Sequence, residues 1–305
     1  MSKEVILALG GGGARGLAHI GVIRALEAAN IRIAAVAGTS IGSVIGGIYC
    51  AGQLDKSEEY VRDLSWTGVL SHFDPTLPRS GVFAGKRVEK VLKELSGDPD
   101  FSDLDIPFCA VATDLSDGNE IHIKEGNVLK AMRASLAIPG VFNPAAINDS
   151  WMIDGCIAAP IPINAARELG NAPIVAVNVN STRIRSSRSI PEKPKEDISG
   201  SQGQERHNLW KQMEKFWRQG IKGKYNETMP GIIPIMSDSI AHLQNHLARY
   251  QMQVDQPDVI VEPPVGNATL LDFHNAGNLI EKGQKAMEAA LAGDPFNSLE
   301  SRERQ

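Results

Sequence analysis

The sequence predicts an α/β protein in which helices cover a parallel or mixed β-sheet. Short apolar runs rich in β-branched residues recur along the chain. Several of them lack polar alternation, which is typical of strands that are buried on both faces. Stretches of helical character lie between these runs, and strands that alternate with helices are the pattern of a layered α/β domain.

The expected elements follow one another in a regular order. Strands are expected at Val5–Leu9, Ala34–Ala37, Pro107–Ala112, Trp151–Ile153, Ile174–Val179 and Val259–Val261. Helices are expected at Leu17–Leu26, Ile41–Ala51, Arg87–Leu95, Asn127–Ser135, Ile163–Leu169, Ser239–Val254 and Leu279–Leu291. The order is interrupted at 181–208, which is polar and too poor in large apolar residues to form a core of its own.

Length and composition narrow the class of protein. The 305 residues suffice for one large domain or two ordinary ones, and 42 % hydrophobic with 22 % charged residues is usual for a globular chain. A formal net charge of −5 argues against nucleic-acid binding. The first residues lack the features of a signal peptide, and no uncharged apolar run approaches the roughly 18 residues needed to span a bilayer.

The cysteines do not suggest a metal site. Cys50, Cys109 and Cys156 lie among apolar residues without the spacing of metal ligands, so we expect buried thiols in a reducing cytoplasm. No metal or other cofactor is expected. The expected location is cytoplasmic, with membrane association as a further possibility.

The stretch ALGGGGARGLAHIG at 8–21 places four glycines directly after the first strand. Gly11, Gly13 and Gly16 fit the dinucleotide fingerprint, but that fingerprint also requires an acidic residue about 20 positions later. The next strand instead ends in Ala-Gly-Thr-Ser at 37–40. A phosphate-binding P-loop would need Gly-Lys-Ser or Gly-Lys-Thr, and the chain has Gly-Leu-Ala at 16–18.

The second strand leads into GTSIG at 38–42, a G-x-S-x-G sequence in front of a helix of small residues. This is the position of a nucleophile elbow, which exposes the hydroxyl of Ser40 at the end of a sheet. Because Gly38 and Gly42 have no side chains, we expect them to prevent crowding in this tight turn. A turn with a helix-capping serine is the simpler alternative.

The glycine loop and Ser40 have complementary roles in one reaction, the attack of a serine on an acyl group. A serine that attacks an acyl carbon creates an oxyanion, which backbone amides at a glycine turn or a helix start can stabilise. The amides of the loop at 10–13 are the expected donors, with that of Ile41 as a supplement. Arg15 would steady the loop or attract an anionic head group, although a solvated arginine fits the sequence equally well.

A serine nucleophile also needs a base, and histidine is the usual one. None of the seven histidines follows the acidic candidates in a loop at a strand end of the core. A carboxylate is therefore the expected base. Asp114 and Asp154 both lie where a strand ends, and each could instead be a turn carboxylate that bonds its own backbone.

Four sequence blocks together resemble the patatin-like phospholipase family, in particular its compact bacterial members. GGGGARGLAHIGVIRAL, GTSIG, SLAIPGVFNP and IDG occur in the order and spacing of that family. The resemblance covers Val5 to about Val179 and is expected to resume near Asp258. It implies a lipid acyl hydrolase with a Ser–Asp dyad on a three-layer α/β/α fold whose central sheet is mostly parallel.

The resemblance also implies roles for individual residues. By position, Ser40 is the nucleophile, Asp154 is the base, and the oxyanion loop is formed by Gly11, Gly12 and Gly13. Asp114 then has a structural role. The family often has a second glycine and an asparagine after its Asp-Gly, whereas this chain reads CIAAP at 156–160. This departure leaves the Ser–Asp dyad intact. It predicts that the edge of the site formed by 156–160 differs in shape from that of other family members.

We expect one hydrolase domain at 1–292, an insertion at 181–255 and a flexible tail at 293–305. Within the insertion, a polar loop precedes an amphipathic segment at 209–224 with Trp210 and Trp217 opposite lysines. That segment suits a lid or a peripheral membrane contact, but packing on the core or on a second copy of the chain is equally compatible.

The predicted function is that of a serine lipid acyl hydrolase of the phospholipase A, lysophospholipase or esterase type. Its partner is a lipid or acyl-ester substrate, and a homo-oligomer is possible. Two alternatives stay open. One is an α/β-hydrolase esterase with a Ser–Asp–His triad, and the other is a regulatory or scaffold protein with vestigial activity.

Overall fold

A computed structural model of the chain describes residues 4–71, 81–180 and 232–296. The chain divides into two compact units, 1–183 with 244–305 and 184–243. The predicted polar loop and the segment 209–224 lie outside the described residues. The larger unit contains the sheet and all the predicted site residues, and its fold is described below.

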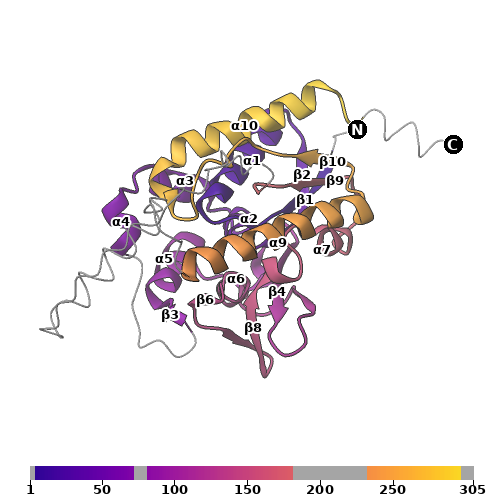
Figure 1. Ribbon diagram of the computed structural model, residues 1–305. Coiled ribbons are helices and arrows are strands. Elements are labelled where there is room, and N and C mark those ends of the chain that lie inside the picture. Colours follow the sequence, from indigo (N-terminus) through magenta and orange to yellow (C-terminus); the bar gives the residue numbers. More distant parts are fainter. Residues whose placement is uncertain (1–3, 72–80, 181–231, 297–305) are drawn as a thin grey trace, which may run out of the picture. The chain divides into compact units, whose positions relative to one another are not determined.

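An eight-stranded sheet forms the centre of this unit (Figure 1). Its strand order is β10 (Val259–Val261), β9 (Ile174–Val177), β1 (Glu4–Leu9), β2 (Arg32–Thr39), β4 (Phe108–Asp114), β8 (Ser150–Asp154) and β7 (Ala145–Ile147). β5 (Glu120–Ile123) also pairs with β4. The strands from β10 to β4 are parallel, whereas β5, β7 and β8 pair antiparallel. The predicted mostly parallel α/β sheet is therefore confirmed.

Helices cover both faces of the sheet because successive strand residues point to opposite faces. Leu7 and Leu9 of β1 face one core, while Ile6 and Ala8 face the other. The first core contains residues of α1 (Ala18–Ala28), α2 (Ile41–Cys50), α6 (Val128–Ser135) and α10 (Ala276–Ala292). The second contains α7 (Ile163–Arg167) and Ala248 of α9 (Ile232–Asp255). The result is the expected three-layer arrangement.

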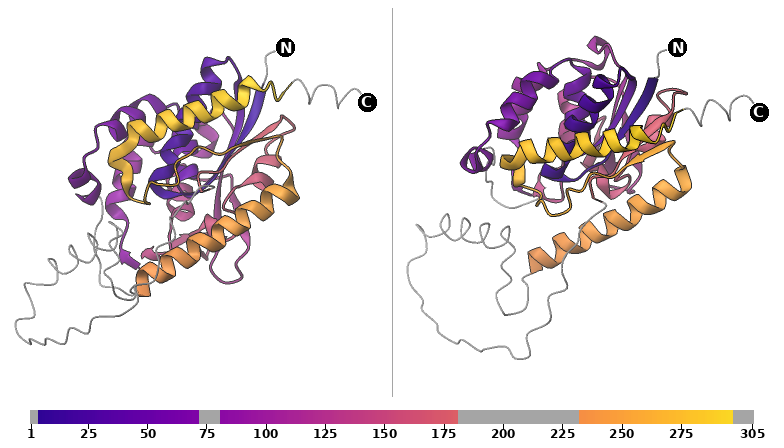
Figure 2. Two further views of the ribbon diagram at one scale, coloured as in Figure 1. Left: turned by 45° about the horizontal axis from the view of Figure 1, so that its top comes forward. Right: turned by 90° about the horizontal axis from the view of Figure 1, so that it is seen from above.

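The last helix packs closely on the first one, as the views in Figure 2 show. A Cβ atom on Gly21 of α1 would lie 1.9 Å from the carbonyl oxygen of Ile280, and one on Gly283 of α10 would lie 1.9 Å from that of Ala18. Only glycine permits this backbone approach. The C-terminal helix therefore supports the helix that follows the glycine loop.

Short elements complete the fold. The helices are η1 (Gly13–Leu17), α3 (Leu54–Arg62), α4 (Trp66–Ser71), α5 (Lys86–Ser96), η2 (Phe101–Asp103), η3 (Gly155–Ile157) and η4 (Asp272–Asn275). β3 (Gly81–Phe83) and β6 (Gly140–Phe142) form a separate parallel pair. The first predicted helix begins as the 3₁₀ turn η1, and the helix expected at Ser239–Val254 is longer at Ile232–Asp255. Among the helices described, none combines the length and hydrophobicity that crossing a bilayer requires.

Candidate active site

Ser40 lies in a tight turn between β2 and α2. Its φ of 54° is rare for a residue with a side chain. A Cβ on Gly38 would lie 2.4 Å from the carbonyl oxygen of Gly42, and one on Gly42 would lie 2.1 Å from that of Leu9. The two glycines therefore allow the backbone to pass close enough to form this turn. Ser40 makes no side-chain cap to α2, which argues against the helix-capping alternative.

The hydroxyl of Ser40 bonds Asp154. Ser40 Oγ donates to Asp154 Oδ2 over 2.6 Å, across 114 residues of sequence. The sheet explains this proximity, because Asp154 ends β8 opposite Ala112 of β4, and β4 is the neighbour of β2. The other carboxylate oxygen of Asp154 accepts from the amide of Cys156 over 2.8 Å.

The Ser40–Asp154 pair is almost completely buried, with 5 % and 3 % of the two residues exposed. Burial raises the pKa of the Asp154 carboxyl, while hydrogen bonds from Ser40 and Cys156 oppose that rise. A carboxylate with a raised pKa is a stronger base. This environment therefore suits acceptance of a proton from Ser40.

Asp114 has a different position. It is partly exposed, and its Oδ1 accepts from the amide of Ser116 over 2.7 Å and from the Ser116 hydroxyl over 2.6 Å. These bonds lower the pKa of Asp114. Asp114 is thus a turn carboxylate, as the family resemblance implies.

No histidine in the described ranges bonds Ser40 or Asp154; His72 and His207 lie outside them. His19 is fully buried in α1, where Nε2 donates to the carbonyl of Gly10 over 2.7 Å. Burial lowers the pKa of His19 to about 4, so its ring is neutral at neutral pH. The geometry therefore gives no support to a triad.

The glycine loop passes directly over Ser40. A Cβ on Gly11 would lie 3.2 Å from Ser40 Cβ and 2.0 Å from Cys156 Sγ. The Gly11 amide donates to the carbonyl of Pro160 over 3.0 Å and is therefore occupied. Within the described part of the chain, the amides of Gly12 and Gly13 have no hydrogen-bond partner. The candidate oxyanion donors are thus these two amides.

Arg15 is not a solvated arginine. It is only 4 % exposed, and its Nε donates to the carbonyl of Gly12 over 3.1 Å. This bond fits the expected steadying of the loop. Contact of Arg15 with an anionic head group stays a prediction.

Three polar residues near the site were not predicted. Ser135 Oγ accepts from the Ser40 amide over 2.8 Å and donates to Val111 over 2.6 Å, which fixes the turn to β4. Thr113 Oγ1 donates to the Asp154 carbonyl over 3.1 Å. Asn180 bonds the glycine loop, as described below. Ser135 opens the block SLAIPGVFNP, which is a signal that could have identified it; Thr113 carried no such signal.

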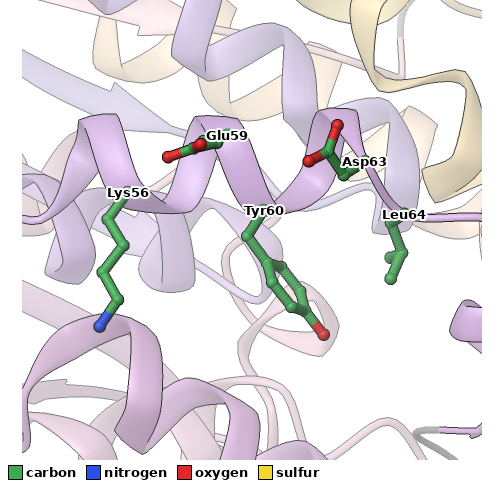
Figure 3. A pocket seen from close by; sticks show the side chains of 5 residues that line it. All are labelled: Lys56, Glu59, Tyr60, Asp63 and Leu64. Atoms are coloured by element: carbon green, nitrogen blue, oxygen red, sulfur yellow. The ribbon is translucent and has the colours of Figure 1, made fainter.

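An open depression of about 330 Å³ lies elsewhere, along α3. Figure 3 shows its lining residues, Lys56, Glu59, Tyr60, Asp63 and Leu64. None of these lining residues is among the partners that hydrogen-bond Ser40 or Asp154. In the described residues, no three His, Cys, Asp or Glu side chains gather in a metal-binding group. Ser40 and Asp154 therefore stay the candidate site.

The fold and the site together define a class of protein. A serine at a strand-to-helix turn, bonded to a carboxylate and placed beside backbone amides, is the arrangement of serine hydrolases. The model of the patatin-like phospholipase family matches residues 7–167, and the chain belongs to this family. At the level of the family, it is a lipid acyl hydrolase.

Relatives with related names match nearly the whole chain. An uncharacterized NTE family protein of Mycobacterium tuberculosis is 28 % identical over 98 % of this chain and 94 % of its own length. The patatin-like phospholipase domain-containing protein 6 of Homo sapiens is 29 % identical over 95 % of this chain, which spans 20 % of that protein. The lysophospholipase NTE1 of Yarrowia lipolytica is 28 % identical over 93 % of this chain, which spans 19 % of that protein.

The crystal structure of VipD from Legionella pneumophila aligns with 96 % of this chain and 67 % of its own, at a TM-score of 0.41 and 13 % identity.

Proposed function

We propose that this protein hydrolyses acyl esters of lipids through a Ser40–Asp154 dyad and an acyl-enzyme. The observation that carries the proposal is the buried 2.6 Å hydrogen bond between the two side chains. It directs the hydroxyl proton at a carboxylate whose pKa is raised by burial. The positive φ of Ser40 at the end of β2 supports the same role, because strained backbone is frequent at nucleophiles.

Each residue of the site has a defined role in the proposed reaction. Asp154 accepts the proton of Ser40 while Oγ attacks the ester carbon, and the amides of Gly12 and Gly13 stabilise the oxyanion. The alcohol leaves with the proton that Asp154 held. Water then attacks the acyl-enzyme, with Asp154 again as the base, and Ser40 recovers its proton as the fatty acid leaves.

A hydrolysis screen tests the dyad. Wild type, Ser40→Ala and Asp154→Asn are compared on phospholipids, lysophospholipids and short-chain esters, with Asp114→Asn as the matched carboxylate control. We expect both dyad variants to lose turnover by about 10³-fold or more, while Asp114→Asn stays within about twofold of wild type. Equal rates in wild type and the dyad variants would refute the proposal.

We also propose that the insertion acts as a lid or as a membrane-facing surface, the latter through 209–224. This rests on the amphipathic pattern of Trp210, Phe216 and Trp217 with lysines. A deletion should end before Ala248, which packs in the core of the larger unit. Removal of 184–231 is expected to weaken binding to phosphatidylcholine vesicles, and unchanged binding by a folded variant would contradict it. The domain limits, the cytoplasmic location and self-association stay predictions.

A further inference from the structure

Three successive carbonyls of the glycine loop each accept a hydrogen bond from a side chain. His19 Nε2 donates to Gly10 over 2.7 Å, Asn180 Nδ2 donates to Gly11 over 2.7 Å, and Arg15 Nε donates to Gly12 over 3.1 Å. The three side chains come from α1, from the segment after β9 and from η1. Side chains from three segments of the chain therefore hold the loop.

These bonds also orient the amides of the loop. A peptide unit is planar, and its carbonyl points away from the N–H of the following residue. The bond to the Gly11 carbonyl therefore orients the amide of Gly12, and the bond to the Gly12 carbonyl orients that of Gly13. These are the two amides without a partner in the described ranges. The peptide between Gly10 and Gly11 is held at both ends, by His19 and by Pro160.

Asn180 is itself well anchored. Its amide donates to Asn178 Oδ1 over 3.0 Å, and Asn178 Nδ2 donates to Glu262 Oε1, just after β10, over 2.9 Å. A Cβ on Gly12 would lie 3.3 Å from Asn180 Oδ1, so the asparagine packs directly on the loop. The position of the segment after β9 therefore fixes the position of the Gly11–Gly12 peptide.

We propose that Asn180 is a positioning residue for ester hydrolysis, which holds the Gly11–Gly12 peptide so that the Gly12 amide meets the oxyanion. The inference depends on the proposed function of Ser40 and Asp154. Glycine is the residue with the most backbone freedom, and oxyanion donors are effective only when they are oriented in advance. Asn180 lies outside the matched range 7–167, so the family motifs do not identify it.

Two substitutions separate this role from packing. Asn180→Ala removes the donor, and Asn180→Asp keeps the shape but replaces the donor by an ionised acceptor that repels the Gly11 carbonyl. We expect kcat to fall by roughly ten- to hundred-fold in both, with KM within about twofold of wild type, since substrate binding does not need the oxyanion donor. Asn119→Ala, in an exposed turn, is the matched control and is expected to match wild type.

A thionoester substrate gives a second readout. Sulfur accepts hydrogen bonds more weakly than oxygen, so the donors of an oxyanion hole assist an oxoester more than its thionoester analogue. Loss of Gly12 orientation should therefore lower the oxoester rate much more than the thionoester rate. A general loosening of the structure would lower both rates to the same extent.

The assays use purified full-length protein, with thermal melting to identify folded variants; Asn180→Gln replaces Asn180→Ala if the latter does not fold. A lower oxoester-to-thionoester rate ratio at unchanged KM supports the role of Asn180. A Ser40-dependent rate and ratio that are unchanged in the Asn180 variants would overturn this inference alone. Equal rates in wild type and Ser40→Ala would overturn the proposed function as well.

Discussion

Two Ser–Asp hydrogen bonds among the described residues have the same length but different surroundings. Ser40 donates to Asp154 over 2.6 Å, and Ser116 donates to Asp114 over 2.6 Å. The first bond joins strands far apart in the sequence and is buried, whereas the second closes an exposed turn two residues long. Burial raises the pKa of Asp154, while the bonds from Ser116 lower the pKa of Asp114.

We expect only one of these two short Ser–Asp bonds to activate its serine. At Ser116, water solvates the hydroxyl and the carboxylate, and the carboxylate is a weaker base than usual. At Ser40, the carboxylate is desolvated, the backbone is strained, and the glycine loop lies directly above. The surroundings of the bond therefore distinguish the two pairs, and the experiments below compare them.

The largest expected effect is on labelling by a fluorophosphonate, which forms a covalent bond with activated serines. We expect Ser40 to be labelled and Ser116 not, because only Ser40 has a desolvated base beside it. Ser40→Ala should abolish labelling and lower turnover by about 10³-fold or more, while Ser116→Ala should leave both near wild type. Labelled peptides identified by mass spectrometry provide the measurement, and modification at Ser116 would contradict the comparison.

The next largest effect is expected from substitutions of a glycine near each Ser–Asp pair. Gly12→Ala would bring a Cβ to 2.6 Å from Val179 Cγ2 and displace the loop, so kcat should fall by roughly ten- to hundred-fold with little change in KM. Gly118→Ala, in the turn of Asp114, meets nothing within 4 Å but has a φ of 77°. It should cost about 1 kcal/mol of stability without a change in kcat. Steady-state kinetics and urea unfolding separate the two outcomes, and a pure KM defect in Gly12→Ala would argue against an oxyanion loop.

The two carboxylates should also affect stability in opposite directions. Because the folded-state pKa of Asp154 is raised, its contribution to stability is present at low pH and is lost as the pH rises through that pKa. At pH 7, Asp154→Asn should therefore raise the melting temperature. Asp114 has a lowered pKa, so its contribution is present at neutral pH and is lost on acidification, and Asp114→Asn should slightly lower the melting temperature. Calorimetry at pH 7 and pH 4 measures the direction of both changes in melting temperature. A lower melting temperature for Asp154→Asn at pH 7 would contradict the expectation that burial of the ionised Asp154 carboxylate destabilises the fold.

The smallest effect is expected at Cys156, whose side chain lies beside Asp154 and helps to lower its pKa against the opposing effect of burial. Cys156→Ala should raise the pKa of Asp154 further and move the acid limb of the kcat/KM profile to higher pH. Cys109→Ala, at a thiol buried in β4 away from the dyad, is the control and should leave the profile in place. Coincident profiles for wild type and Cys156→Ala would exclude this influence.

Much of this organisation could be predicted from local sequence. The expected strand at Val5–Leu9, the elbow at Ser40 and the glycine loop are contiguous segments whose pattern is readable, and β1, β2 and the start of α2 lie where expected. The choice between Asp114 and Asp154 could not be made from the residues alone, because both end a strand. Only the pairing of Ala112 with Asp154 brings one of them to Ser40.

Contacts between residues far apart in the sequence could not be predicted from the sequence alone. Asn180 reaches Gly11 across 169 residues, and Ser135 reaches Ser40 across 95. Asn180 lies in none of the sequence blocks. Ser135 opens the block SLAIPGVFNP, but the sequence does not show that it reaches Ser40, because that contact depends on strand order and register. The short strands β3 and β6 were also missed, because three-residue strands carry too little periodicity to be recognised.

The packing of the C-terminal region on the N-terminal loop has a consequence for synthesis of the chain. The amide of Ala14 donates to the carbonyl of Leu270 over 2.9 Å, and Gly283 of α10 contacts α1. A ribosome synthesises the glycine loop before it synthesises these supporting residues. The nascent chain can therefore bury Ser40 against β4 early. If Ser40 is the nucleophile as proposed, we expect no hydrolytic activity until about residue 283 has left the exit tunnel.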